Sequence, residues 1–236
     1  MIRKNSRKSS NPIQLICTDA VKISMNGLIP RQKSGFRFVS ENINLKYLPH
    51  GSKVFETSIE CMFNGEKMGI IECHPRSSVH NKDLCTLKVD NRLMYSKGWT
   101  KKIKESIKEL NLSFSHLTNI DVAVDCIDDN TFKFVRDYAQ GKNHKVGKAT
   151  FDISYGGMDE NYMPIIQYFR FGKRGGDKFV RGYYKRQEIA KSNKHYISEW
   201  WQHNGLVPEE GQEVARIEMS IKRRELKKIV EAGEMD

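Results

Sequence analysis

Two aspartates separated by three residues lie in the strand-like run at residues 119–125, which reads Asn-Ile-Asp-Val-Ala-Val-Asp. On a strand, Asp121, Ala123 and Asp125 project from one face because successive side chains alternate. Two carboxylates on one face, with a small residue between them, supply the hard oxygen ligands that a divalent cation prefers. Two alternatives remain open. Asp121 caps a turn or pairs with a nearby arginine, or Asp125 begins the loop that contains Asp128.

A second run, residues 179–188, places a tyrosine between two cations. If this run is a strand, Arg181, Tyr183 and Lys185 share a face. Two positive charges beside a phenol favour its ionised form, and they also hold a phosphodiester. Tyr184 points the other way and is the better candidate for the core. A tyrosine among basic residues on a half-solvated strand is common in any sheet, so this run alone does not establish a nucleophile.

A third run, residues 214–221, alternates polar with apolar residues. On a strand, Arg216, Glu218 and Ser220 face one way and the apolar side chains face the core. The three runs together supply carboxylates, a tyrosine and basic groups in one chain. A structural ion pair between Arg216 and Glu218 on an exposed face explains the third run almost as well.

The charge balance favours a polyanionic partner. The 236 residues include 40 Lys and Arg against 29 Asp and Glu, which leaves a formal charge of +11. Each phosphate that a basic surface neutralises releases condensed counterions, so nucleic acid is the leading class of partner. Many soluble proteins are simply basic, and charge alone does not decide the question.

Several classes of protein are disfavoured. No stretch approaches the roughly 18 consecutive apolar residues of a membrane span. The basic N-terminus has no apolar segment of a secretion signal behind its charges. The five cysteines form no Cys-x-x-C pair, which favours buried thiols in a reducing compartment. We therefore expect a cytoplasmic protein without membrane association.

The positioning elements follow from local patterns. Asn64-Gly65 predicts a tight hairpin turn between two strand-like runs. Strands are predicted at residues 13–25, 53–63, 68–73, 84–89, 117–126, 149–155, 164–171, 178–185 and 214–221. Helices are predicted at residues 99–112, 131–140, 195–203 and 224–232. Strands and helices mix without a strict βαβ repeat, which predicts an α+β fold with a mainly antiparallel sheet and flanking helices.

The chain divides into an arm and a domain. Residues 1–12 are basic and rich in Ser and Asn, and we expect a flexible arm in which Arg3 and Lys4 contact nucleic acid. No shift in composition divides residues 13–236. We expect a single domain there, with two similar halves as an alternative arrangement.

The stretch from residue 168 to 188, YFRFGKRGGDKFVRGYYKRQE, resembles the Rep_trans-type rolling-circle replication initiators. These serve plasmids and filamentous phages, and they have relaxase relatives on conjugative elements. The family pattern runs from a Tyr-x-x-Gly strand into hydrophobic-Arg-x-Tyr-x-Lys-x-x-Glu. The aspartate run is similar to the family's upstream element, and residues 216–218 to its later Arg-hydrophobic-Glu strand. The matched elements come in the family's order and span residues 117–222.

The resemblance implies a strand-specific DNA nickase with a fold like that of the HUH endonucleases and RRM domains. In the family, a tyrosine attacks the origin phosphodiester and forms a 5′-phosphotyrosine with a free 3′-OH. Carried over to this chain, it implies Tyr183 as the nucleophile, with Lys185 and Arg181 offsetting phosphate charge. It also implies Mg²⁺ or Mn²⁺ on ligands drawn from Asp121, Asp125, Glu188 and Glu218.

The resemblance further implies contacts with DNA and with other proteins. The basic residues expected to bind nucleic acid in the matched region are Lys173, Arg174, Arg186 and Arg216. The expected partners are single-stranded or supercoiled origin DNA and a host helicase, and the formation of a homodimer is left open. The aromatic residues considered for base stacking are Phe169, Phe171, Trp200 and Trp201. For the tryptophan pair, burial as a helix anchor is the favoured alternative.

Three features depart from the family pattern. The chain has no His-hydrophobic-His pair for the metal triad of an HUH enzyme. Asn119 stands where the family often has Arg, and Tyr184 places a second phenol beside Tyr183. The alternatives are a relaxase of a mobile element, a non-catalytic DNA-binding protein of the same fold, and an RNA-binding module. The RNA-binding alternative does not explain the acids.

Overall fold

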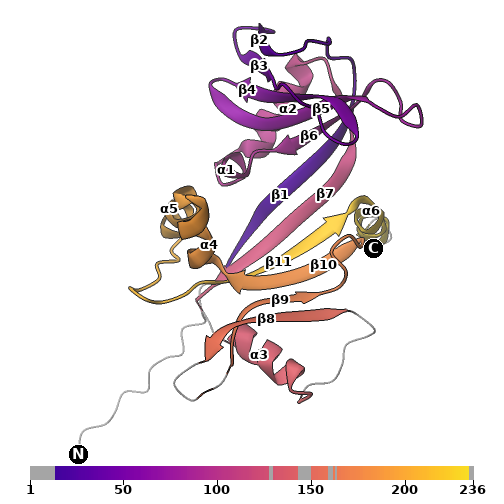
Figure 1. The fold of residues 1–236 in the computed structure, drawn as a ribbon. Coiled ribbons are helices and arrows are strands. Elements are labelled where there is room, and N and C mark those ends of the chain that lie inside the picture. Colours follow the sequence, from indigo (N-terminus) through magenta and orange to yellow (C-terminus); the bar gives the residue numbers. More distant parts are fainter. Residues whose placement is uncertain (1–13, 128–129, 143–149, 159–161, 163, 234–236) are drawn as a thin grey trace, which may run out of the picture.

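The computed structural model describes residues 14–127, 130–142, 150–158, 162 and 164–233. Over these residues the protein is an α+β fold built on one 11-stranded sheet, flanked by six helices (Figure 1). Every pair of neighbouring strands is antiparallel. The predicted α+β class with a mainly antiparallel sheet is therefore confirmed.

The strands lie in the order β2-β3-β4-β5-β6-β1-β7-β11-β10-β9-β8. Their bounds are β1 (Gln14–Asn26), β2 (Gly35–Phe38), β3 (Ile43–Tyr47), β4 (Phe55–Phe63), β5 (Glu66–Pro75), β6 (Leu84–Val89), β7 (Ser113–Cys126), β8 (Phe151–Met158), β9 (Pro164–Phe171), β10 (Lys178–Tyr184) and β11 (Ala215–Lys222). The helices are α1 (Asn91–Met94), α2 (Trp99–Glu109), α3 (Asn130–Ala139), α4 (Lys185–Ser192), α5 (His195–His203) and α6 (Arg223–Gly233). None of the helices in the described ranges has both the length and the apolar character needed to span a bilayer.

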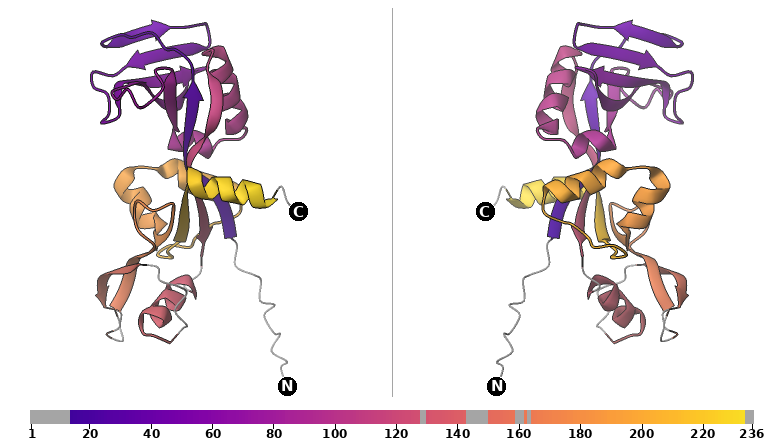
Figure 2. Two further views of the ribbon diagram at one scale, coloured as in Figure 1. Left: turned by 90° about the vertical axis from the view of Figure 1, so that its right-hand side faces the viewer. Right: turned by 90° about the vertical axis from the view of Figure 1, so that its left-hand side faces the viewer.

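The long strands β1 and β7 join two lobes (Figures 1 and 2). One lobe contains β2 to β6 with α1 and α2, and the other contains β8 to β11 with α3 to α6. β1 pairs with β7 from Gln14 to Asn26, but it pairs with β6 only from Lys22 to Asn26. Among the described residues, no strand therefore lies beside the other edge of β1 over residues 14–21. The assignment of residues 13–236 to a single domain stays a prediction.

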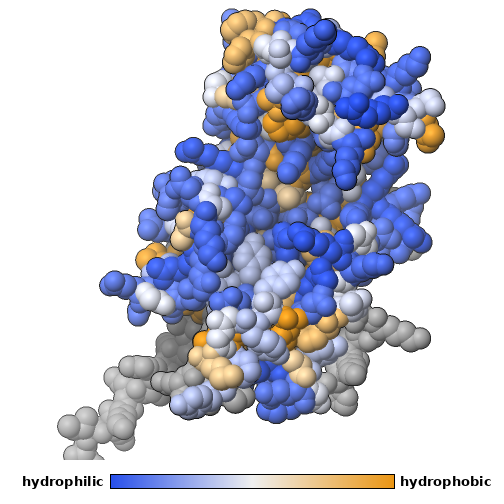
Figure 3. Space-filling model, viewed as in Figure 1, coloured by the Kyte–Doolittle hydropathy of each residue, from blue (hydrophilic) through white to orange (hydrophobic). Residues whose placement is uncertain are grey.

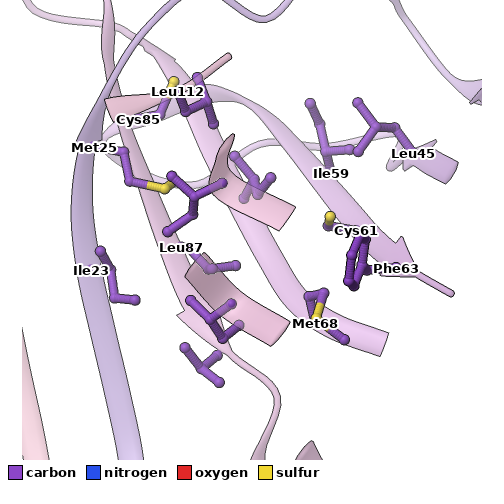
Figure 4. Close-up of a cluster of buried hydrophobic side chains, with 14 of the residues drawn as sticks. Ile23, Met25, Leu45, Ile59, Cys61, Phe63, Met68, Cys85, Leu87 and Leu112 are labelled. Atoms are coloured by element: carbon purple, nitrogen blue, oxygen red, sulfur yellow. The ribbon is translucent and has the colours of Figure 1, made fainter. Parts of the chain in front are cut away.

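The N-terminal lobe is held together by a core between its strands and α2. The buried side chains alternate along β1, β4 and β6, and α2 adds Ile103 and Ile107 from one face (Figure 4). Asn64 and Gly65 both have positive φ, at 50° and 76°, which is the conformation that a tight hairpin turn between twisted strands requires. The predicted Asn-Gly hairpin is confirmed. Cys17 is half-buried and the other four cysteines are buried, which agrees with the expected packing role.

The C-terminal lobe packs α3 against the apolar face of its sheet. Phe132 of α3 stacks on Tyr184 with ring centres 4.3 Å apart and contacts Phe169 edge-on. Gly182 lies directly beneath Phe169, where an added Cβ would approach the ring to 2.2 Å. The predicted packing of Tyr184 into the core is confirmed. The proposed stacking of Phe169 on bases is wrong, because this ring is buried.

Two differences from the sequence-based expectations affect the site. The elements β2, β3, α1 and α4 were not predicted, and β10 ends at Tyr184, so Lys185 begins a helix instead of ending a strand. The burial of β11 is also the reverse of the expectation. Glu218 is fully buried, whereas Met219 is 41% exposed. The reason is that the polar face of β11 carries ion pairs with neighbouring strands, while the apolar face packs against the cluster around Phe132 of α3 at Ala215 and Ile217 and leaves Met219 uncovered.

Candidate active site

Two rows of cross-strand neighbours bring the predicted residues onto one face of the sheet. The first row runs across β1, β7, β11, β10 and β9 as Leu15, Asp125, Arg216, Tyr183 and Tyr168. The second row runs across the same strands as Cys17, Ala123, Glu218, Arg181 and Arg170. The face shared by Asp121, Ala123 and Asp125 is therefore the face of Tyr183, as the alternation predicts.

The Tyr183 hydroxyl lies between a carboxylate and an ammonium group. It donates to Glu218 Oε2 at 3.1 Å and accepts from Lys185 Nζ at 3.3 Å. The other oxygen of Glu218 pairs with Arg181. The Lys185 ammonium also lies 5.4 Å from the centre of the Tyr183 ring. A half-buried phenol with a base on one side and a cation on the other has the arrangement of an activated nucleophile.

The phenol is protonated in the resting site. Burial raises the pKa of Tyr183, and the neighbouring charge of Glu218 raises it further. The expectation that flanking cations favour the ionised phenol is therefore wrong. The reason is that the charges of Arg181 and Lys185 are already neutralised by ion pairs with Glu218 and Glu188. A separate base must take the phenolic proton before Tyr183 can attack.

The two partners of Tyr183 have shifted pKa values of opposite sign. Burial raises the pKa of Glu218, although Arg181 opposes the shift. Burial lowers the pKa of Lys185, with Arg216 adding to the shift and Glu188 opposing it. A carboxylate of raised pKa is a better proton acceptor than an ordinary one. Both shifts bring these groups closer to the range in which they exchange protons near neutral pH.

A second ionic cluster lies beside the first and is centred on Arg216. The Nε and Nη2 atoms of Arg216 each lie 2.6 Å from an oxygen of Asp125, and Nη1 lies 2.6 Å from Asp19 Oδ1. Trp201 Nε1 of α5 donates to Asp125 Oδ2 at 2.7 Å. Burial opposes ionisation of Asp19, but Arg216 and Lys185 outweigh it and lower the pKa of Asp19 to about 2. Because Arg216 is wholly buried, the expected contact of its side chain with nucleic acid is wrong.

The four acids expected to hold a divalent cation do not assemble into a metal site. Each is held by a polar neighbour, in the pairs Asp121–Asn119, Asp125–Arg216, Glu188–Lys185 and Glu218–Arg181. Within the described ranges, no group of three or more His, Cys, Asp or Glu side chains could hold a metal ion. The residues therefore do not fit the implied Mg²⁺ or Mn²⁺ site, because cations from neighbouring strands and from α4 already neutralise three of the carboxylates.

The remaining basic residues differ in their availability. Lys173 and Arg174 are exposed in the turn between β9 and β10. Arg186 donates to the backbone carbonyls of Glu209 and Gln212 and braces that loop. Arg3 and Lys4 lie outside the described residues. Most of the surface in view is hydrophilic, which suits a charged ligand (Figure 3).

Three residues of the site were not singled out from the sequence. Asp19 lies where the register between β1 and β7 shifts, and such a bulge redirects a side chain. An acid inside an otherwise apolar strand was the available signal. Tyr95 donates its hydroxyl proton to Asp19 at 2.7 Å, and Lys194 pairs with Glu188 at 3.0 Å. Neither of these carried a local pattern, since each reaches the site from a turn outside the strands.

The comparisons with known proteins find similarity among solved structures. No family model matches the chain, and no curated protein sequence matches it significantly. Among solved structures, the chain is similar to a rolling circle replication initiator protein from Geobacillus stearothermophilus. The identity is 14% and the TM-score 0.47, over 89% of this chain and 74% of that chain. A likeness of this size does not assign a function, so the function below is argued from the site.

Proposed function

We propose that this protein cuts and rejoins a DNA strand through a covalent bond to Tyr183, as a replication initiator of the rolling-circle type. The observation that carries the proposal is the position of the Tyr183 hydroxyl, within hydrogen-bond distance of both Glu218 and Lys185. The sequence resemblance around residues 168–188 and the formal charge of +11 support DNA as the substrate.

The reaction begins with transfer of the phenolic proton to Glu218 while the phenolic oxygen attacks phosphorus. The bond from phosphorus to the 3′ oxygen breaks, and the leaving oxygen takes a proton from solvent. The products are a 5′-phosphotyrosine and a free 3′-OH. The tyrosyl ester conserves the energy of the phosphodiester, so the reverse reaction rejoins the strand without ATP.

Charge stabilisation comes from the two cations of the site. Lys185 stabilises negative charge as it develops on the phenolic oxygen and the phosphate. Protonation of Glu218 neutralises the partner of Arg181. The Arg181 side chain, 27% exposed, is then free to pair with the phosphate. Proton transfer and phosphate binding are thereby coupled through Glu218.

A non-catalytic DNA-binding protein of the same fold is the second candidate. It is favoured by the complete pairing of the charges around Tyr183, which a structural network also requires. A relaxase of a mobile element would use the same chemistry on other DNA. For an initiator, we expect single-stranded or supercoiled origin DNA as substrate and a host helicase as the partner after cleavage.

The test uses single-stranded oligonucleotides from the DNA around the gene, incubated with Mg²⁺ or Mn²⁺ and separated on a denaturing gel. We expect a slow protein–DNA band with the wild type and with Tyr184→Phe, and none with Tyr183→Phe. The Tyr184 variant is the matched control, because this ring stacks on Phe132 in the core. A band of equal intensity with Tyr183→Phe would refute the nucleophile. Tight binding without any band would favour the non-catalytic protein.

A further inference from the structure

A large groove lies beside the site, along the edge of β1 that no other strand of the described ranges pairs with. Its volume is about 1160 Å³, above the range of about 300–1,000 Å³ that is usual for small-molecule sites. Its walls come from the segment around α1, from the turn between β4 and β5, and from α5, and its floor comes from β1 and β7. Figure 1 shows α1 and α5 on the same side of β1. The size suits a segment of a polymer better than a small ligand.

Three aromatic rings form a cluster in the wall of this groove. Tyr95 lies 5.6 Å from Tyr196 in a tilted arrangement and 5.4 Å from Trp200 edge-on, measured between ring centres. All three side chains are half-buried and line the groove. Of the tryptophan pair, Trp201 is buried as the favoured alternative predicted, whereas Trp200 remains accessible. Accessible rings of this kind are platforms on which unpaired bases stack.

Two basic side chains at the rim of the groove are without an ion-pair partner among the described residues. Arg92 and Lys97 are exposed at its rim beside α1, and neither forms an ion pair with a residue that the structure describes. Of the acids in the lining, Glu66 is paired with Lys102 and Asp90 caps the N-terminus of α1. Asp90 and Glu199 keep their negative charge, because neither forms an ion pair with a residue that the structure describes, so the groove carries no net positive charge. Arg92 and Lys97 are still available as individual phosphate ligands, because no carboxylate is paired with either of them.

The groove and the site lie on the same face of the sheet. Cys17 lines the groove and lies in the same cross-strand row as Arg181 of the site. Arg181 is three strands away from Cys17. At about 4.8 Å per strand this separation is about 15 Å. The Tyr95 hydroxyl donates to Asp19 at 2.7 Å, Asp19 binds Arg216 at 2.6 Å, and Arg216 is the cross-strand neighbour of Tyr183. A strand can therefore run from one place to the other without crossing the sheet.

We propose that the groove between α1 and α5 holds single-stranded DNA a few nucleotides from the phosphate that Tyr183 attacks. Its bases stack on Tyr95, Tyr196 and Trp200, and its phosphates contact Arg92 and Lys97. The proposal rests on the proposed function for the identity of the strand. The segment must be unpaired, because bases inside a duplex stack on one another and are not available to side chains.

The binding test is done in the Tyr183→Phe background, which prevents cleavage, with a fluorescent thymidine oligonucleotide as the probe. We expect Arg92→Glu with Lys97→Glu to weaken binding about tenfold or more. The matched control is Lys53→Glu with Lys82→Glu, which makes the same change in charge at exposed positions outside the groove. We expect the control to lose less than about threefold. Equal losses of affinity in the two double variants would refute binding in the groove and would leave only general attraction between the basic protein and DNA.

The stacking test uses Trp200 and a photoreactive base. We expect Trp200→Leu to weaken binding about tenfold and Trp200→Phe to retain most of it, since a phenyl ring still stacks. An oligonucleotide containing 5-iodouracil should crosslink to Tyr95, Tyr196 or Trp200, and duplex DNA should not. Crosslinks confined to other elements, or equal competition by duplex, would overturn the proposal.

The groove and the proposed function fail in different ways. If the groove variants lose affinity but the wild type forms no covalent adduct with any oligonucleotide, the groove stands and the cutting reaction falls. If the wild type forms the adduct while binding does not respond to the groove variants, the reaction stands and the groove falls. In the second case an extended peptide beside the free edge of β1 becomes the occupant to test.

Discussion

At the scale of single residues, the chemistry depends on Glu218 as the acceptor of the phenolic proton. Its pKa is raised above the ordinary 4.5, and that of Lys185 is lowered from 10.5, both chiefly through burial. Glu218 must be ionised to act as a base, and Lys185 must be protonated to stabilise charge. We therefore predict a bell-shaped pH profile for adduct formation, with its acid limb above pH 4.5 and its alkaline limb below pH 10.5.

Substitution of Glu218 tests this assignment. Glu218→Gln keeps an acceptor for the Tyr183 hydroxyl but does not take up its proton. We predict that the rate of adduct formation falls about 10²–10⁴-fold, that the acid limb of the pH profile disappears, and that affinity for an oligonucleotide changes little. Single-turnover rates from pH 4 to pH 10 would measure this. A Gln variant that keeps the acid limb would exclude Glu218 as the base.

Asp125 has a structural role in this account. Its carboxylate is fully buried and binds Arg216 through both oxygens. Removing one partner of a buried ion pair costs about 3–5 kcal/mol, because the other charge is left uncompensated. We predict that Asp125→Ala lowers the melting temperature and that added Mn²⁺ does not restore it or the activity. Rescue of activity by Mn²⁺ without a change in melting temperature would point to a metal ligand instead.

The ionised Asp19 carboxylate makes the stability of the fold depend on pH in the acid range. Its folded pKa is lowered to about 2 from 3.8. Its contribution to stability is therefore complete above pH 3.8 and is lost as the pH falls through about 2. We predict that Asp19→Asn is less stable than the wild type at pH 6 and that the difference narrows toward pH 2. Urea unfolding at a series of pH values would measure it, and a constant difference would contradict the ionised role of Asp19.

At the scale of elements, the close contact of β10 with Phe169 of the neighbouring strand β9 fixes the position of Tyr183. Gly182, the residue before it, has the Phe169 ring directly above, at 2.2 Å from an added Cβ. Overpacking a core typically costs about 1–3 kcal/mol. We predict that Gly182→Ala lowers the melting temperature by several degrees. Gly175→Ala, in the turn before β10, is the matched control because no atom lies within 4 Å of its added Cβ. Equal melting temperatures for the two variants would contradict this packing.

The elements also show what the sequence could and could not predict. The bounds of β9 and α5 agree with the expected residues 164–171 and 195–203, because each has a long, regular pattern. The two strands β2 and β3 have only 4 and 5 residues, too few for a clear period. Alternation predicted which side chains of β11 share a face, but it does not tell which face is buried. That depends on α4 and α5, which pack there from outside the strand.

The site was predicted in the same partial way. The closeness of Tyr183 and Lys185 is real, but Lys185 reaches the hydroxyl from the start of α4 and not from a strand. The acids were expected to bind a metal ion because their partners were not visible in local spacing. Arg216 and Asp125 are 91 residues apart in the chain, and only the pairing of β7 with β11 brings them together.

At the scale of the whole molecule, β1 and β7 connect a site on one lobe with a groove that both lobes line. A protein with a formal charge of +11 that binds a phosphate backbone loses affinity as the salt concentration rises. The reason is that the release of condensed counterions then contributes less to the free energy of binding. We predict that the logarithm of affinity for a single-stranded oligonucleotide falls linearly with the logarithm of salt, by about 0.7 for each phosphate contacted. A flat response would contradict a nucleic-acid role for the molecule.

The most direct measurement of the central claim is to locate the nucleotide on the protein. The wild type is incubated with an intact oligonucleotide that it cleaves. The product is digested with nuclease and protease and analysed by mass spectrometry. We predict a nucleotide linked through its 5′ phosphate to Tyr183, and to no other tyrosine on that face, including its cross-strand neighbour Tyr168. A nucleotide on Tyr168 or Tyr184, or cleavage without any linked nucleotide, would contradict the account.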